Sequence, residues 1–275
     1  MAKKAKNARH RANRRIGRAA RRDLEDAYVT ARNDEHVAQS LGLPSTPGGW
    51  LTRAAFKLFE LDEKCRFLTP QGKRQTIPKV VVDLGAAPGG WTQMAQSAAE
   101  GDGDSRGSIA PPTLFALDKL PLAPELAYQE GVNFIQGDFL DFEVQDHLSS
   151  RIHAVTNIPL DQPGVDVVLS DMMANTSGNR ITNTAASLSL VMAAHHFCLR
   201  NLKVGPHSWL VIKVFQSEEA MRWRKAVLER CFDSVGTHRA KTSRVTSPEV
   251  YWVCRGHRGG GHGALEEAGN HESGF

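Results

Sequence analysis

Cysteine is scarce in this chain, and its four cysteines are widely separated. No C-x-x-C pair occurs, so neither a disulfide framework nor a zinc site built on paired cysteines is indicated. We expect no metal site. The thiols are expected to be reduced, as in a cytoplasmic compartment, at Cys65, Cys198, Cys231 and Cys254.

Long apolar runs are also absent. No stretch approaches the roughly 20 apolar residues of a membrane-spanning helix, and no apolar core of a signal peptide follows the basic start. We therefore expect a soluble protein that has no membrane partner and stays inside the cell. With 275 residues, 41% of them hydrophobic, the chain can bury one core, and one α/β domain with tails is the economical organisation.

Acidic residues are missing from the first 22 positions, which hold ten Lys or Arg. Such a block cannot bury itself and repels itself, so residues 1–22 are expected to form a disordered basic arm. An arm of this kind suits the phosphates of RNA, whereas the plainer interpretation is a solvated tail. A third interpretation is a mitochondrial presequence, because such peptides are rich in arginine and free of acids, although serine is absent here.

Two further segments contain few residues that could form a hydrophobic core. Residues 23–50 include the turn-rich stretch LGLPSTPGGW and are expected to form an irregular connector. Residues 257–275 form a tail rich in glycine and histidine, for which a disordered end is favoured over metal binding through the histidines. The folded domain is therefore expected between residues 51 and 256.

The rest of this domain is organised around the stretch KVVVDLGAAPGGWTQMAQ at residues 79–96. The run of Val80, Val81 and Val82 predicts a strand buried on both faces, and a helix is expected after the glycine-rich turn. This arrangement directs free backbone N–H groups, and the positive end of a helix dipole, at whatever lies over the loop.

Two kinds of ligand could use this loop. A dinucleotide fingerprint requires G-x-G-x-x-G, but Ala87 stands at the second glycine position and Pro88 follows it. Asp83 at the strand end suits a cationic group instead, such as the amino group of a methionine moiety. The structural alternative is that the glycines only form a turn between strand and helix.

Strand and helix patterns alternate along the domain, as βαβ units require. Thr52 is expected to cap a helix within residues 51–64. Further helices are expected at 182–202 and 217–230, and further strands at 113–118, 131–139, 165–171, 208–215, 232–239 and 249–256.

Acids follow three of these strands, at Asp118, Asp138 and Asp171. The carboxyl ends of parallel strands form the edge at which open α/β sheets bind ligands, so Asp118 is expected to accept hydrogen bonds from ribose hydroxyls and Asp138 from an adenine amino group. Lys213 interrupts the apolar run SWLVIKVF. Because an unpaired buried ammonium costs several kcal/mol, Lys213 needs an anionic partner or a catalytic role.

The motif DLGAAPGGW resembles the S-adenosylmethionine loop of the FtsJ-type (RrmJ-like) ribosomal RNA 2′-O-ribose methyltransferases. The resemblance covers about residues 20–256 and continues in order through LTRAAFKLFELDEK, ALDKLPL, FIQGDF, VVLSDMMANTSGN, WLVIKVFQ and SRVTSPEVYWV. It implies a Rossmann-like α/β fold whose seven-stranded sheet is mostly parallel, with an antiparallel last strand. The family usually has Ala-Pro where this chain has Met173-Ala174, so the loop after the fourth strand lacks a stiffening proline.

The resemblance also implies S-adenosylmethionine as cofactor and a Lys-Asp-Lys-Glu tetrad, which matches Lys57, Asp171, Lys213 and Glu249. In the family's mechanism Lys213 would take the proton or stabilise the developing oxyanion, while the other three position it and orient the ribose. No metal is required. The residues implied to bind the cofactor are Asp83, Gly85, Gly89, Gly90, Trp91, Asp118, Asp138 and Asp171.

The implied function is methylation of a ribose 2′-hydroxyl, of a uridine, in large-subunit ribosomal RNA during ribosome assembly. We expect a monomer that acts on the rRNA or the large ribosomal subunit in the cytoplasm, or in a mitochondrion if the arm is a presequence. Two alternatives stay open: a related 2′-O-methyltransferase of tRNA or an mRNA cap, and a ribosome-assembly factor whose catalysis is dispensable. The first alternative shares the tetrad, so only mapping of the methylated nucleotide separates it.

Overall fold

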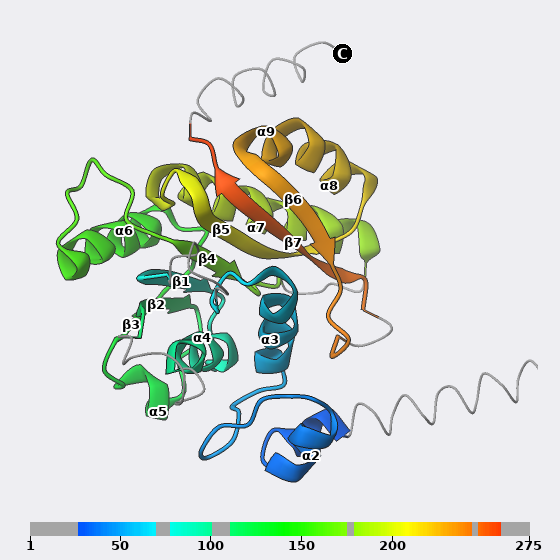
Figure 1. Cartoon of the computed structure of the whole chain (residues 1–275). Coiled ribbons are helices and arrows are strands. Elements are labelled where there is room, and N and C mark those ends of the chain that lie inside the picture. The colour runs from blue at the N-terminus through cyan, green and yellow to red at the C-terminus, as the bar shows by residue number, and fades with distance from the viewer. Residues whose placement is uncertain (1–26, 70–77, 101–110, 175–178, 244–246, 260–275) are drawn as a thin grey trace, which may run out of the picture.

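The structure is a computed structural model of the chain, and it describes residues 27–69, 78–100, 111–174, 179–243 and 247–259. The strands in these ranges form one sheet in the order β3-β2-β1-β4-β5-β7-β6 (Figure 1). Strands β1 to β5 pair in parallel, and β7 is antiparallel to both of its neighbours, which confirms the expected fold class. The strands are β1 Val80–Leu84, β2 Thr113–Asp118, β3 Val132–Gln136, β4 Val167–Ser170, β5 Gly205–Phe215, β6 Phe232–His238 and β7 Glu249–His257.

Helices cover both faces of this sheet (Figure 1). Residues of α3 and α4 pack on one face, and residues of α6, α7 and the continuous α8–η1–α9 segment pack on the other. The middle part of that segment, η1, is a π-helix. The helices are α2 Glu35–Ser40, α3 Ala54–Cys65, α4 Gly90–Glu100, α5 Pro124–Ala127, α6 Phe142–Thr156, α7 Arg180–Asn201, α8 Glu218–Trp223, η1 Arg224–Leu228 and α9 Glu229–Cys231.

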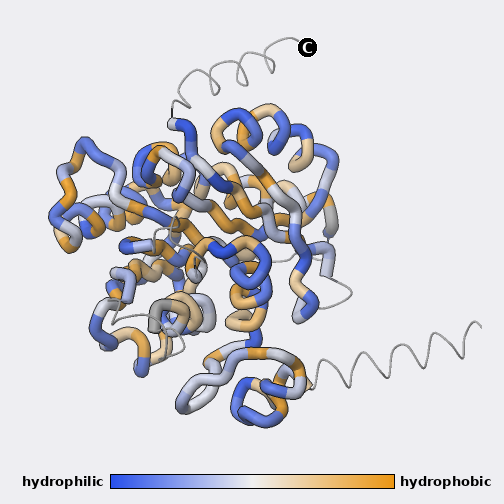
Figure 2. The backbone as a smooth tube through the Cα atoms, viewed as in Figure 1, coloured by the Kyte–Doolittle hydropathy of each residue, from blue (hydrophilic) through white to orange (hydrophobic). Residues whose placement is uncertain are grey.

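Successive strand residues supply the two cores. In β1, Val80 and Val82 face the core beneath α6 and α7, whereas Val81 between them faces the core beneath α3 and α4. This alternation follows from the pleat, which directs neighbouring side chains to opposite faces. Figure 2 shows hydrophobic residues concentrated along the central strands, as a sheet covered on both sides requires.

Several element boundaries differ from the sequence-based expectation. Helix α3 begins at Ala54, and its N-cap is Arg53 rather than Thr52 as expected; Thr52 instead accepts a hydrogen bond on Oγ1 from the Ala54 N–H at 3.2 Å. Helix α6 was not predicted from the sequence. The third and fourth strands are shorter than expected by a few residues at their ends, where polar or turn-forming residues leave the ladder.

The described part of the connector, residues 27–50, is more ordered than an irregular linker. It contains α2, whose N-cap Asp34 accepts from two backbone N–H groups. Trp50 is 2% exposed, and its ring meets Phe56 of α3 edge-on at 6.4 Å. The segment therefore forms a layer over α3. The basic arm at residues 1–22 lies outside the described residues, as does the tail from residue 260 on. The tail was expected from residue 257, but His257 is the last residue of β7 and pairs with Phe232 of β6. Within the described residues no helix is long and apolar enough to cross a membrane.

Candidate active site

The glycine-rich loop between β1 and α4 is fixed from the side of β2. The Gly85 and Ala86 N–H groups both donate to the Leu117 carbonyl, at 2.8 and 3.1 Å. Asp118 accepts from the Ala87 N–H at 2.9 Å through Oδ2 and from the Leu120 N–H at 2.8 Å through Oδ1. Asp118 therefore holds the loop in place with the carboxylate that the sequence assigns to ribose binding.

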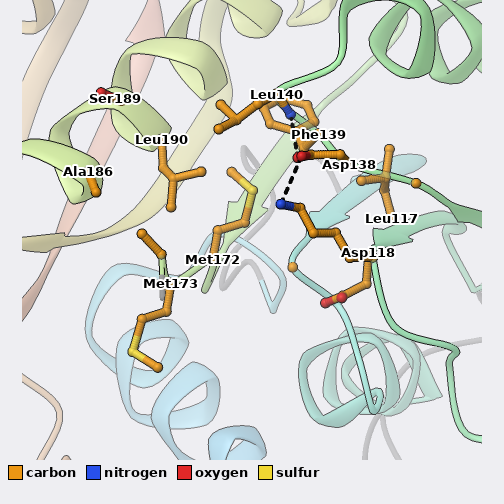
Figure 3. A pocket seen from close by; sticks show the side chains of 14 residues that line it. Leu117, Asp118, Asp138, Phe139, Leu140, Met172, Met173, Ala186, Ser189 and Leu190 are labelled. Atoms are coloured by element: carbon orange, nitrogen blue, oxygen red, sulfur yellow. Dashed lines mark hydrogen bonds and ion pairs between the residues drawn. The ribbon is translucent and has the colours of Figure 1, made fainter. Parts of the chain in front are cut away.

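A pocket of about 420 Å³ opens beside this loop (Figure 3). Its walls are mostly apolar, and the carboxylates of Asp118 and Asp138 stand on one side of it. Three of the residues predicted to bind the cofactor line it, namely Gly85, Asp118 and Asp138. The other lining residues are Leu117, Lys119, Gly137, Phe139, Leu140, Met172, Met173, Ala174, Ala186, Ser189 and Leu190.

The lining fits a nucleoside in both size and chemistry. A ligand site of this volume is ordinary for a small molecule, and carboxylates among apolar walls accept hydrogen bonds from amino and hydroxyl groups. Gly85 has a φ of +79°, and a Cβ there would lie 2.8 Å from Met172 Cα, so only glycine lets the loop approach Met172 this closely. The residues present therefore suit the adenosyl part of the implied cofactor.

Asp138 is held by two donors. Lys119 Nζ lies 2.8 Å from its Oδ2, and the Leu140 N–H donates to Oδ1 at 3.0 Å (Figure 3). The hydrogen bond from Lys119 lowers the pKa of Asp138 against a small opposing effect of burial. Asp138 is thus an ionised acceptor at the rim of the pocket, and Lys119 is a neighbour that sequence reasoning missed.

Asp83 lies beneath the loop rather than in the pocket. Its side chain is buried, and Oδ2 accepts from the Thr92 hydroxyl in the first turn of α4 at 2.7 Å. Oδ1 is buried without a hydrogen-bond partner among the described residues. Burial, and then the charges of Asp171 and Asp118, raise the pKa of Asp83 to about 7 against the opposing hydrogen bond from Thr92. In this structure the side chain of Asp83 contacts the start of α4 and does not line the pocket.

Gly89, Gly90 and Trp91 also stand outside the lining. Gly89 has a φ of +128°, and a Cβ there would meet the Leu126 side chain. A Cβ on Gly90 would meet the Thr52 side chain, so both glycines allow close packing of the loop and α4 against their neighbours. Trp91 is buried and donates from Nε1 to the Ala54 carbonyl of α3 at 2.8 Å. Packing contacts take up the space beside the two glycines and surround the Trp91 side chain. Only the backbone groups of these residues are therefore left to contact a ligand.

The four residues of the expected tetrad gather on the α3 side of the sheet edge as two ion pairs. Lys213 of β5 lies 3.0 Å from Asp171 Oδ1 and also donates to the Asp171 carbonyl. Lys57 of α3 lies 2.7 Å from Glu249 Oε1 at the start of β7. Lys213 is only 8% exposed, and Asp171 is the anionic partner that the sequence argument required of a buried ammonium.

Charges in this cluster interact across the two pairs. Burial raises the pKa of Glu249, but the ammonium of Lys57, aided by that of Lys213, outweighs it and holds that pKa below its ordinary value. Glu249 is therefore ionised at neutral pH, and the cluster contains two carboxylates facing two lysines. Within the described residues, no group of three or more His, Cys, Asp or Glu side chains is arranged to hold a metal ion.

Tyr251 is a further member of this cluster that sequence reasoning missed. Its hydroxyl donates to Asp171 Oδ1 at 2.9 Å, and its ring lies 5.7 Å from that of Trp91. Burial, with the charges of Asp171 and Glu249, raises the pKa of Tyr251 well above its ordinary value, so the hydroxyl stays protonated. The only sequence signal was its place two residues after Glu249 on the same face of a strand.

Comparisons with known proteins identify the family of the chain. A family model described as FtsJ-like methyltransferase matches residues 50–257. A relative from Azoarcus sp., named ribosomal RNA large subunit methyltransferase E, is 39% identical over 228 residues, which cover 83% of this chain and 90% of the relative. A protein of the same name from Nitrobacter winogradskyi is 38% identical over 231 residues, covering 83% and 84%.

A solved structure is similar as well. A Plasmodium falciparum protein described as a ribosomal RNA methyltransferase superposes with a TM-score of 0.58 at 25% identity, covering 77% of this chain and all of that one. Because the family model spans most of the chain and the relatives align along most of their own length, the chain belongs to the FtsJ-like methyltransferase family.

Proposed function

We propose that this protein transfers a methyl group from S-adenosylmethionine to the 2′-hydroxyl of a uridine ribose in large-subunit ribosomal RNA. The observation that carries the proposal is the Lys57–Glu249 and Lys213–Asp171 cluster beside a nucleoside-sized pocket on one sheet edge. Support for the RNA substrate comes from the relatives, which are named ribosomal RNA large subunit methyltransferase E.

The pocket residues would hold the cofactor. S-adenosylmethionine supplies, when bound, a methyl group on a positively charged sulfur. Asp118 and Asp138 offer carboxylate oxygens to hydroxyl and amino groups, and the walls of Met172 and Leu190 offer apolar contact. The buried carboxylate of Asp83 lies below the loop and would favour a cationic ligand above it through its charge, without touching it.

In this proposal Lys213 accepts the proton of the ribose hydroxyl. Its Nζ has two acceptors among the described residues, the side-chain and backbone oxygens of Asp171. A neutral amine can donate to both and still direct its lone pair at a third position, where a hydroxyl can lie. A positioned group of this kind contributes about 10²–10⁴-fold to the rate.

The remaining members of the tetrad hold Lys213 and the substrate in place. Asp171 fixes the direction of the Lys213 amine through two contacts, and Glu249 fixes Lys57 through an ion pair with little solvent access. The Lys57 ammonium then adds positive charge where an oxyanion develops. This arrangement orients an acceptor oxygen and stabilises its charge, as an in-line methyl transfer requires.

Single-turnover methyl transfer from labelled S-adenosylmethionine, measured against pH, tests the role of Lys213. We expect the wild-type rate to rise with pH and Lys213→Ala to lose about 10²–10⁴-fold. Lys213→Arg should recover little of it, because a guanidinium does not release its proton in the working range. Lys203→Ala is the matched control, since Lys203 also pairs with an acid, Asp166, but stands just before the start of β5. An Arg variant near full activity would show that Lys213 supplies only positive charge.

The substrate is tested by offering naked ribosomal RNA, isolated large subunits, tRNA and capped mRNA to the same enzyme and mapping the ribose methyls. We expect a single uridine of the large-subunit RNA to be labelled. Labelling confined to tRNA or a cap would reject the rRNA assignment. An active-site variant that restores subunit assembly in cells lacking the protein would show that assembly needs the protein and not its methyl transfer.

A further inference from the structure

Tyr251 contacts three parts of the site at once. Its hydroxyl donates to Asp171, its ring lies 5.7 Å from the Trp91 ring at an interplanar angle of 39°, and the Lys57 ammonium stands 5.9 Å from its ring centroid. The side chain is fully buried, so these contacts are made without competition from solvent. Tyr251 therefore lies between the glycine-rich loop, through Trp91, and both ion pairs of the tetrad.

The Tyr251 hydroxyl and the Lys213 amine contact the same oxygen of Asp171. Asp171 Oδ1 accepts from Tyr251 at 2.9 Å and lies 3.0 Å from Lys213 Nζ. Lys213 and Tyr251 are direct partners in the antiparallel pairing of β5 and β7, so the sheet itself fixes both side chains on the same face. Two donors on a single carboxylate oxygen share its negative charge between them.

We propose that Tyr251 is a positioning residue for the reaction: its hydroxyl fixes the Asp171 carboxylate and weakens the hold of that carboxylate on the Lys213 proton. The proposal rests on the proposed function, in which neutral Lys213 receives the proton of the ribose. Tyr251 would then act together with the four residues of the tetrad. Its ring contact with Trp91 connects the start of α4 to this cluster.

The shared oxygen determines whether Tyr251 favours the neutral or the protonated form of Lys213. A hydrogen bond to a carboxylate stabilises its charge, so the oxygen attracts a neighbouring ammonium less strongly. Without the hydroxyl, Lys213 interacts with the full charge of the Asp171 carboxylate, which favours the protonated form of Lys213. The other charged groups that face this position are Lys57 from α3 and Glu249 from β7, while Asp83 at the end of β1 acts on Asp171 from below.

The first measurement follows the protonation of Lys213 directly and needs no RNA. The full-length protein is labelled with ¹³C at the lysine ε-carbon, the Lys213 signal is assigned with Lys213→Arg, and its chemical shift is followed against pH. In Tyr251→Phe we expect the midpoint of deprotonation to move upward by about half to one pH unit. An unchanged or lower midpoint in a folded variant would overturn the proposal.

The second measurement is the single-turnover rate against pH. Below both midpoints the rate follows the neutral fraction of Lys213, so Tyr251→Phe should be slower by about three- to ten-fold. At a pH above both midpoints the variant should approach the wild-type rate. A loss of the same size at every pH would mean that the hydroxyl only supports the local structure, and it would reject the proposal.

Tyr28→Phe is the matched control, because Tyr28 is a buried tyrosine that packs on Phe56 at 6.5 Å, away from Asp171. It should leave both pH midpoints unchanged. Failure of the proposal and failure of the proposed function are distinguishable, since the shift of the Lys213 signal is measured without a substrate. If wild-type protein transfers no methyl group to ribosomal RNA, the function is rejected while the spectroscopic arm still decides the role of Tyr251.

Discussion

Replacing Asp83 with Asn should make the ligand-free protein more stable at pH 8. Asp83 is fully buried at the end of β1, with Oδ2 satisfied by Thr92 and Oδ1 without a partner among the described residues. The nearby charges of Asp171 and Asp118 disfavour its ionised form further. Asparagine keeps an acceptor for the Thr92 hydroxyl, and its amide group can donate towards the neighbouring carboxylates where the aspartate has no donor.

The magnitude follows from the raised pKa of Asp83. Each pKa unit corresponds to about 1.4 kcal/mol, so a rise from 3.8 to about 7 makes the ionised form cost about 4 kcal/mol of folding free energy. Below about pH 4 both folded and unfolded chains hold the proton, and no cost arises. Between about pH 4 and 7 only the folded chain holds it, so stability falls as pH rises and the whole cost is present above pH 7.

Urea unfolding at a series of pH values between about 4 and 8.5 measures this effect. The free energy of unfolding of Asp83→Asn minus that of the wild type should grow with pH across this range, and taking the difference cancels the contributions of the histidines. Asp161→Asn, the loss of an exposed acid, is the control and should show no such trend. A difference that is flat with pH would refute the argument, because it would mean that Asp83 is ionised without penalty in the folded chain.

Further predictions concern the pocket, the tetrad, the arm and a buried histidine. Asp118→Ala should weaken S-adenosylmethionine binding by about 1.5–3 kcal/mol in calorimetric titration, because the hydrogen bonds to a charged acceptor are removed. Lys57→Met should cost about 2–3 kcal/mol in chemical unfolding by leaving Glu249 unpaired, and a Glu249→Met change added to it should recover part of the loss. Deleting residues 2–22 should reduce the log–log salt slope of RNA binding by about 0.7–0.9 for each RNA phosphate that the arm neutralises, without changing cofactor affinity. Burial, then nearby histidines, lower the pKa of His195 to about 4, so the unfolded chain binds an extra proton between about pH 6.5 and 4. As the pH is lowered over that range, the contribution of His195 should reduce stability by about 3 kcal/mol, seen as the free energy of unfolding of the wild type minus that of His195→Gln in chemical unfolding.

The fold was predictable because its signals are local. The valine run of β1, the glycine-rich turn and the alternation of strands and helices each follow from a few neighbouring residues. The number of strands and the antiparallel β7 came from the family resemblance instead, and the order of the strands was not predicted. Helix α6 and the layer at residues 27–50 were not predicted, and both pack through residues distant in sequence, with α6 in the core beneath α7 and the layer against α3.

The candidate site was predictable in its charged members and less so in their roles. Lys213 stood out because a charge inside a buried strand is costly. Its partner Asp171 directly follows β4, which pairs with the strand β5 that holds Lys213. Tyr251 gave no such signal, since a tyrosine in an apolar strand is an ordinary core residue. For Asp83, a strand-end acid next to a glycine loop suggests ligand contact, whereas the structure shows a buried side chain that accepts from Thr92 at the start of α4.

The glycine-rich loop and α3 constrain each other. Gly90 admits the Thr52 side chain, and Trp91 binds the Ala54 carbonyl, so the loop fixes the first turn of α3. Farther along that helix, Glu60 accepts from the backbone N–H groups of Lys241 and Thr242, in the segment that leads to β7. Lys57 lies between these two attachments. Gly90 and Trp91, which lie outside the pocket lining, therefore help to position Lys57 opposite Glu249, and a change in either should alter catalysis even where cofactor affinity is unchanged.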